Sequence, residues 1–182
     1  MIIGIAGTLA AGKGTVVEYL KERRGFAHYS VSGILKDMLE EDGVSASRAH
    51  LSALADKLNE QYEGGILHVA NERAKADGVK DYILESIHRE SEATYVRSLG
   101  GIILGVDADA KKRYERTMKR QEGEKDNVTY EEFLERIQHE EEGKGSGSPH
   151  IRAVIENADF VVTNNGTLEE LHAQIDEVLK KI

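Results

Sequence analysis

A glycine-rich stretch near the start of the chain has the residue types that hold a phosphate group. Residues 7 to 15 read G-T-L-A-A-G-K-G-T and follow the apolar run I-I-G-I-A. Glycine and alanine leave room for backbone N–H groups to approach phosphate oxygens, and a helix that starts there favours an anion at its N-terminus. Lys13 adds a positive charge for the outer phosphates of a nucleoside triphosphate.

The spacing of this stretch, Gly7-x-x-x-x-Gly12-Lys13-Gly14-Thr15, predicts a P-loop that binds ATP. The hydroxyl of Thr15 is suited to Mg²⁺, which prefers oxygen ligands. A glycine-rich turn without a ligand is the alternative, but the predicted strand and helix lie where a P-loop needs them. We expect ATP to contact the loop and the first helical turn, at Gly7, Ala10, Ala11, Gly12, Lys13, Gly14, Thr15 and Val16.

A second group of polar residues follows another apolar run. The sequence E-S-I-H-R at residues 85–89 comes directly after the predicted strand Y-I-L. The carboxylate of Glu85 is placed to hold Mg²⁺ through a water molecule, and Arg89 could grip a phosphate with two parallel hydrogen bonds. A surface turn with a solvated charge pair is the alternative for both residues. We expect His88 to be structural or solvated.

Arginines form a third group. Arg113, Arg116 and Arg120 are three and four residues apart on one face of a predicted helix, while Arg136 and Arg152 flank the stretch G-K-G-S-G-S-P. Phosphoryl transfer builds negative charge on the transferred oxygens, and arginines from a closing lid stabilise that charge. A solvated helix face is the alternative, and we expect it for the lysines at 111, 112 and 119.

These residues need a scaffold that brings strand ends together, and the pattern along the chain predicts one. Short apolar runs predict strands near residues 2–6, 26–31, 81–85, 101–107 and 158–163. Helical spacing, or a Thr-x-x-Glu capping box, marks the segments between and after them. Strands that alternate with helices predict an α/β fold with a parallel sheet covered on both faces, and so three layers.

Composition limits the class of protein. The chain has 182 residues, 40% of them hydrophobic and 31% charged, which suits one ordinary globular domain. A net charge of −9 makes nucleic acid and anionic membranes improbable partners. The absence of cysteine excludes disulfides and fits a cytoplasmic protein, and no apolar run approaches the roughly 20 residues of a membrane span.

At this point the chain resembles the nucleoside monophosphate kinase group of P-loop kinases, with adenylate kinases and dephospho-CoA kinases closest in pattern. The sequence G-K-G-T at 12–15 is the adenylate kinase form. The segment H-Y-S-V-S-G-I-L-K at 28–36 is similar to that family's H-I-S-T-G-D-M-L-R, and residues 85–89 keep the acid-to-arginine spacing of D-G-F-P-R. The ending A-D-F-V-V-T-N-N-G-T-L-E-E-L at 158–171 resembles dephospho-CoA kinases.

The resemblance implies a P-loop NTPase fold of three layers with two additions to its core. The core would cover residues 1–30, 80–119 and 151–182, with a helical acceptor lobe at about 31–79 and a lid at about 120–150. Ser32, Lys36 and Arg89 would bind the acceptor, and Asn165 and Gly166 would lie near the adenine of ATP. Arg116, Arg120 and Arg136 match lid arginines of the family, which are catalytic together with Lys13 and Arg89.

Three departures from the family concern the acceptor and the metal. Glu85 replaces an aspartate, Lys36 replaces an arginine, and no aspartate near Ser30 matches the base of dephospho-CoA kinases. We therefore expect transfer of the γ-phosphoryl group of ATP, with Mg²⁺, to a small phosphorylated acceptor such as a nucleoside monophosphate. Dephospho-CoA kinase activity and a regulatory ATP-binding module without turnover are the alternatives, and the sequence leaves the oligomeric state open.

Overall fold

The computed structural model describes residues 1–120, 128–142 and 150–182. One sheet of five parallel strands has the order β2-β3-β1-β4-β5. The strands are β1 (Ile2–Gly7), β2 (Ala27–Tyr29), β3 (Tyr82–Ile87), β4 (Ile102–Asp107) and β5 (Phe160–Thr163). Because β3, β1 and β4 are adjacent and parallel, their carboxyl ends lie at one edge of the sheet.

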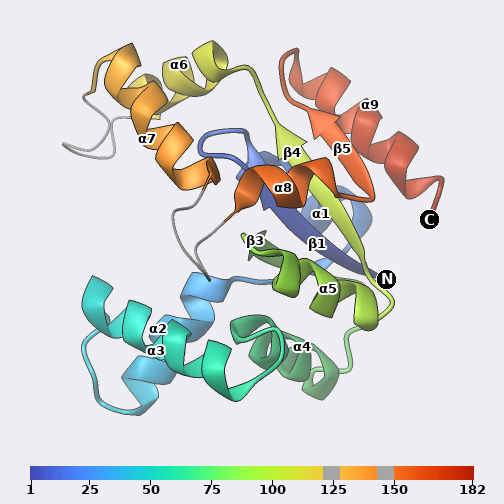
Figure 1. Ribbon diagram of the computed structural model, residues 1–182. Helices are drawn as coiled ribbons and strands as arrows, with labels where there is room; N and C mark the ends of the chain where they lie inside the picture. Colours follow the sequence, from blue (N-terminus) through green and yellow to red (C-terminus); the bar gives the residue numbers. More distant parts are fainter. Residues whose placement is uncertain (121–127, 143–149) are drawn as a thin grey trace.

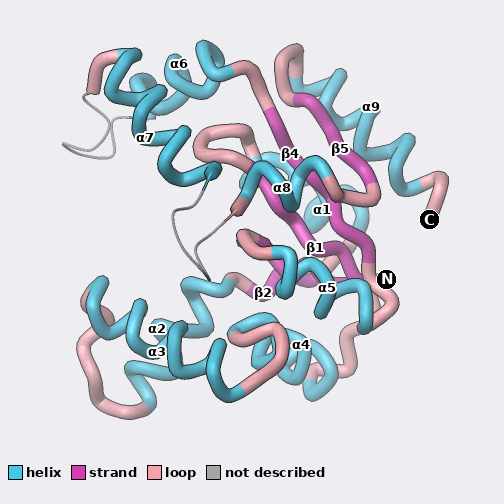
Figure 2. The backbone as a smooth tube through the Cα atoms, viewed as in Figure 1, coloured by secondary structure: helices cyan, strands magenta, loops and turns pink. Residues whose placement is uncertain are grey.

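Helices cover both faces of the sheet (Figures 1 and 2), which confirms the three-layer α/β prediction. One face carries α1 (Lys13–Arg24) and α9 (Leu168–Leu179), and the other carries α5 (Glu90–Ser98) and α8 (Ile151–Glu156). Two further groups lie at opposite ends of the view in Figure 1. They are α2 (Val31–Glu41), α3 (Arg48–Gln61) and α4 (Ile66–Ala76) in one group, and α6 (Ala110–Arg120) and α7 (Tyr130–Glu142) in the other.

Alternation along the strands divides the core into two clusters. Ile3 and Ile5 of β1 are fully buried on the side of α1 and α9, while Ala6 is buried on the side of α5 and α8. Successive strand residues point to opposite faces, so a short run that is apolar throughout must be covered on both sides. The continuous apolar character of β1 and β4 therefore follows from their central position in the sheet.

A bulge interrupts β3 next to the predicted metal-binding acid. Ile5 pairs with Glu85 and the next residue, Ala6, pairs with Ile87, so Ser86 is an extra residue in β3. Ser86 has φ 65°, an uncommon conformation for a residue with a side chain. The strand predicted to end at Glu85 thus continues to Ile87, and the bulge turns Ile87 into the core.

Helix starts that the sequence marked with capping boxes form as expected. The N–H of Glu132 donates to Oγ1 of Thr129 at 3.2 Å, and the N–H of Thr129 donates to Oε2 of Glu132 at 2.7 Å. The same reciprocal pair joins Thr167 and Glu170 at the start of α9. These bonds satisfy N–H groups that have no partner inside the helix. Within the described ranges, no helix is long and apolar enough to cross a membrane.

Candidate phosphate-binding site

The loop between β1 and α1 has the backbone conformation of a phosphate cradle. Ala10 and Gly12 have φ values of 58° and 104°, and α1 begins at Lys13 directly after them. A Cβ atom on Gly12 would lie 2.2 Å from Nδ2 of Asn164, and one on Gly7 would lie 2.7 Å from the carbonyl oxygen of Val106. Both positions therefore require glycine, for lack of space and, at Gly12, also for its positive φ.

Lys13 lies across this loop. Its Nζ donates to the carbonyl oxygens of Gly7 at 2.8 Å and of Thr8 at 3.1 Å, which places the ammonium group over the loop. A Cβ atom on Gly14 would meet nothing within 4 Å, so the space above the first helical turn is open. A charged group, exposed helix N–H groups and open space together make an anion site.

Two residues from distant parts of the chain brace the loop from the side. Nδ2 of Asn164 donates to the carbonyl oxygen of Ala11 at 2.9 Å, and Nη2 of Arg116 donates to the carbonyl oxygen of Asn164 at 2.7 Å. Nη1 of Arg116 also lies 3.3 Å from the carbonyl oxygen of Ala11. Arg116 thus reaches the phosphate loop, while its predicted lid role stays a prediction. The sequence reading missed Asn164, although it directly precedes the predicted Asn165.

An acid at the end of β4 is a second residue that sequence reasoning missed. Oδ1 of Asp107 accepts from the buried hydroxyl of Thr8 at 3.2 Å, and Oδ2 accepts from Nη1 of Arg152 at 2.9 Å. Asp107 therefore connects the phosphate loop to α8, which carries Arg152. The sequence contained the signal for Asp107, since it is an acid at the end of a predicted buried strand, the same pattern that pointed to Glu85.

Glu85 faces the same side of the sheet as Ile5, where it meets a histidine from β2. Nε2 of His28 lies 3.2 Å from Oε2 of Glu85, but among the described residues this buried nitrogen has no partner in hydrogen-bond geometry. The contact is therefore best described as electrostatic. The His28 ring is the largest cause that lowers the pKa of Glu85, and burial opposes it. Glu85 is consequently ionised at neutral pH.

The donor set suits Mg²⁺ bound together with ATP. Thr15 supplies a hydroxyl beside the loop and Glu85 an ionised carboxylate, and both are only partly buried. In the part of the chain that the structure describes, no group of three or more His, Asp or Glu side chains could hold a metal alone. Mg²⁺ commonly takes one or two protein ligands and completes its shell with phosphates and water, which agrees with this sparse set.

Arg89 lies beyond the bulge, at the start of α5, and borders a cavity. Its Nη1 lies 3.2 Å from Oε1 of Glu92, whose other oxygen accepts from the N–H of His88 at 2.7 Å and of Arg89 at 3.1 Å. The Glu92 carboxylate thereby holds both the backbone N–H and the guanidinium of Arg89. Arg89 and Glu92 line a cavity of about 540 Å³ that reaches α3 and the turn before α4.

The other two predicted acceptor residues lie on α2. Oγ of Ser32 is 3.2 Å from Oγ of Ser30, which caps α2 by accepting from the N–H of Gly33. Lys36 is exposed one turn further along, and it does not line the cavity beside Arg89. The phosphate contact predicted for both Lys36 and Arg89 therefore stays a prediction.

The remaining predicted residues are found at different depths. Asn165 and Gly166 form the turn before α9, where Nδ2 of Asn165 donates to Oδ1 of Asp109 at 2.8 Å. Arg136 is half-buried on α7, and the side chain of Arg120 lies outside the described residues. Arg113 is only 3% exposed, so it is not on the open helix face that its spacing predicted. Lys112 is exposed, as predicted, and its Nζ also donates to the carbonyl oxygen of Asn165.

Comparison with known proteins agrees with this geometry. A family model described as an AAA domain matches residues 3–143. A UPF0200 protein from Methanothermobacter thermautotrophicus is 30% identical over 191 residues, which cover 100% of this chain and 90% of that protein. A second UPF0200 protein, from Sulfurisphaera tokodaii, is 28% identical and covers 100% of this chain and 97% of its own.

Two kinases of known structure share the fold. Shikimate kinase from Aquifex aeolicus superposes with a TM-score of 0.54 at 17% identity, covering 100% of this chain and 97% of its own. Dephospho-CoA kinase from Campylobacter jejuni superposes with a TM-score of 0.57 at 14% identity, covering 99% and 96%. The chain therefore belongs to the AAA domain family and to the UPF0200 proteins, with the fold of P-loop kinases.

Proposed function

We propose that this protein is an ATP-dependent phosphotransferase that acts on a nucleoside monophosphate. The conformation of the loop before α1 carries the proposal. Lys13 lies over backbone carbonyls of a loop with two positive φ values, and the first turn of α1 is open above it. This arrangement supports binding of the ATP phosphates by Lys13 and the loop N–H groups.

In the proposed reaction, a phosphate oxygen of the acceptor attacks the γ-phosphorus of ATP. The bond from the γ-phosphorus to the bridging oxygen breaks, and ADP leaves with that oxygen. Mg²⁺, when bound through Thr15 and Glu85, would neutralise charge on the phosphates. Arg89 would orient the acceptor phosphate. Arg116 would then give up its hydrogen bonds to the loop carbonyls and contact the transferring group instead. Arg120 and Arg136 are proposed to assist it.

Replacement of Lys13 tests the donor half of this proposal. We expect Lys13→Ala to lower kcat/KM for ATP-dependent transfer at least about a hundredfold, since a preorganised charge at a developing anion contributes on that order. Lys21→Ala is the matched control, because Lys21 is an exposed lysine on the same helix. The measurement is formation of ADP and of the nucleoside diphosphate with Mg-ATP. Equal activity in the two variants would contradict the proposal.

Dephospho-CoA is the second candidate acceptor, and one observation favours it. An alcohol must lose a proton during transfer, and the ionised Glu85 is a carboxylate at the carboxyl end of β3 that could take it. A panel of nucleoside monophosphates and dephospho-CoA with Mg-ATP separates the two candidates. Turnover of dephospho-CoA alone would replace the first candidate, and tight ATP binding without turnover of any acceptor would indicate a regulatory module.

A further inference from the structure

The cavity beside Arg89 has an unusual balance of charge for a site that receives a phosphorylated molecule. Its walls come from α3, the turn between α3 and α4, and the start of α5. Among the described residues, four carboxylates line it, against the single guanidinium of Arg89, and these acids are Asp56, Glu60, Glu63 and Glu92. A uniform site for anions would place positive charge on both walls.

The charges are separated between the two sides of the cavity. Glu92 and Arg89 belong to the α5 side, where Glu92 is occupied by two backbone N–H groups and by Arg89. Asp56, Glu60 and Glu63 belong to the opposite wall, and none of the three has an ion-pair or hydrogen-bond partner among the described residues. The α5 side of the cavity thus suits an anion, and the opposite wall offers carboxylate oxygens that can accept hydrogen bonds.

We call the wall formed by Asp56, Glu60 and Glu63 the acidic wall. The spacing of its two residues on α3 places both on the side of the helix that lines the cavity. Asp56 and Glu60 are four residues apart and lie on one face of the helix, so both carboxylates face the cavity together. Two like charges at this spacing are mildly destabilising in the absence of a ligand. Carboxylates accept hydrogen bonds and donate none at neutral pH, so this wall is matched by N–H donors and repels carbonyl oxygens.

We infer that the acceptor is a nucleoside monophosphate whose base carries an exocyclic amino group, and that Asp56, Glu60 and Glu63 select that group. This inference rests on the proposed function. The phosphate meets Arg89, and the amino-bearing edge of the base meets the acidic wall. Cytosine, guanine and adenine present N–H₂ donors to such a wall, whereas uracil carries a carbonyl oxygen in place of the amino group of cytosine, and hypoxanthine carries one in place of the amino group of adenine.

Two pairs of substrates that differ in this amino group test the inference. With Mg-ATP and the full chain, we expect kcat/KM for CMP to exceed that for UMP, and for AMP to exceed that for IMP, by at least about tenfold. A hydrogen bond to a charged group accounts for discrimination of this order. Equal efficiency within both pairs would overturn the inference while the proposed function stands. Turnover of none of these four nucleotides, nor of GMP, would overturn both.

A double variant connects the discrimination to the acidic wall. Asp56→Asn with Glu60→Gln keeps both shapes but adds amide donors that can pair with a carbonyl oxygen. We expect the CMP-to-UMP and AMP-to-IMP ratios to fall at least about threefold. Glu41→Gln is the control, because Glu41 is an exposed acid on α2 outside the cavity. Unchanged ratios in the double variant, with a normal unfolding temperature, would assign the selection to other residues and overturn the inference.

Discussion

At the scale of single residues, the phosphate loop depends on close approaches that leave no room for a side chain. Gly12 has φ 104°, and the amide of Asn164 occupies the place where its Cβ would stand. Asn164 is itself 7% exposed and bonded to Ala11 and Arg116. Because Asn164 is buried and hydrogen-bonded, moving its side chain aside would cost free energy. Gly14, two residues away, has no such restriction.

Alanine at these two glycines should therefore have different consequences. We expect Gly12→Ala to lower the free energy of unfolding by about 2 kcal/mol or more, from a strained φ and the collision with Asn164. Gly14→Ala should leave the stability nearly unchanged, since its Cβ enters open space in a helix. Urea unfolding at neutral pH measures both variants. A loss in Gly14→Ala as large as that in Gly12→Ala would show that the contact with Asn164 is not the cause.

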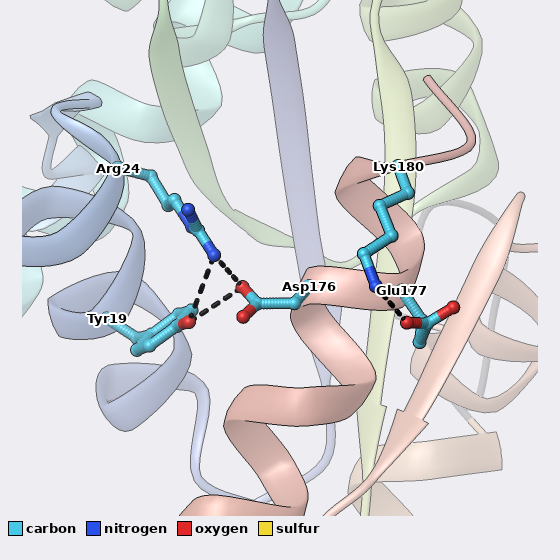
Figure 3. Close-up of polar contacts among 5 residues, drawn as sticks. All are labelled: Tyr19, Arg24, Asp176, Glu177 and Lys180. Atoms are coloured by element: carbon cyan, nitrogen blue, oxygen red, sulfur yellow. Dashed lines mark hydrogen bonds and ion pairs between the residues drawn. The ribbon is translucent and has the colours of Figure 1, made fainter.

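At the scale of elements, α9 is attached to α1 by polar contacts far from the phosphate loop. We call the group formed by Tyr19, Arg24 and Asp176 the polar clamp (Figure 3). The hydroxyl of Tyr19 donates to Oδ1 of Asp176 at 2.6 Å, and Arg24 forms an ion pair with the same oxygen. The ring of His172 stacks on Tyr19 at 4.0 Å between centroids. The hydrogen bond from Tyr19, followed by that from Arg24, lowers the pKa of Asp176.

The lowered pKa predicts how the stability of this clamp depends on pH. The carboxylate stabilises the folded chain above the unfolded pKa of about 4, and the contribution is lost as pH falls through the lower folded value. We expect Asp176→Asn to lower the thermal unfolding temperature at pH 7, and we expect the difference from the parent protein to narrow below pH 4. A difference that stays constant down to pH 2 would exclude the charge as its source.

Glu177 provides the matched control for this experiment. Its partner Lys180 is one turn away on the same helix, and both side chains are more than half exposed (Figure 3). Such a pair joins no separate elements and is screened by water, so Glu177→Gln should change the unfolding temperature much less than Asp176→Asn. Equal effects would indicate that any charge removed from α9 acts through net charge alone.

At the scale of the whole molecule, contacts among distant parts of the chain converge on the loop after β1. Asp107 ends β4, Asn164 follows β5 and Arg116 comes from α6, and all three bond to residues between Thr8 and Ala11. An anion bound at the loop would therefore be connected, through one residue each, to β4, to the end of β5 and to α6. The groups α2–α4 and α6–α7 lie at opposite ends of the view in Figure 1.

Ligand binding at the loop should consequently stabilise the folded chain as a whole. At a Mg-ATP concentration one hundred times its Kd, mass action adds about 2.7 kcal/mol, or roughly 5 to 10 °C for a domain of this size. We expect Lys13→Ala to lose most of this shift at the same concentration, with differential scanning calorimetry as the measurement. An equal shift in Lys13→Ala would place ATP elsewhere. Because no acceptor is present, this result is independent of phosphoryl transfer.

The sequence alone determined the elements and the position of the phosphate-loop motif. Strand and helix periods, the two Thr-x-x-Glu boxes and the P-loop spacing are local patterns, because backbone geometry repeats every two or 3.6 residues. The division into core, acceptor lobe and lid, and the roles assigned to Arg116, Arg120 and Arg136, remain predictions. The assignment of Lys36 and Arg89 to the acceptor phosphate also remains a prediction, because it relies on local similarity of two separate segments, which does not specify how α2 packs against α5.

Only the tertiary structure decided which side chains meet at the loop and in the cavity. Asn164 and Ala11 are 153 positions apart, and Thr8 and Asp107 are 99 apart. Contacts of this kind depend on strand order and register, where the single extra residue Ser86 redirects the end of β3. The acidic wall also depends on tertiary packing, since Asp56 and Glu60 line the cavity only because α3 lies opposite Arg89. Local periodicity carries no information about such pairings, because they are set by the packing of whole elements.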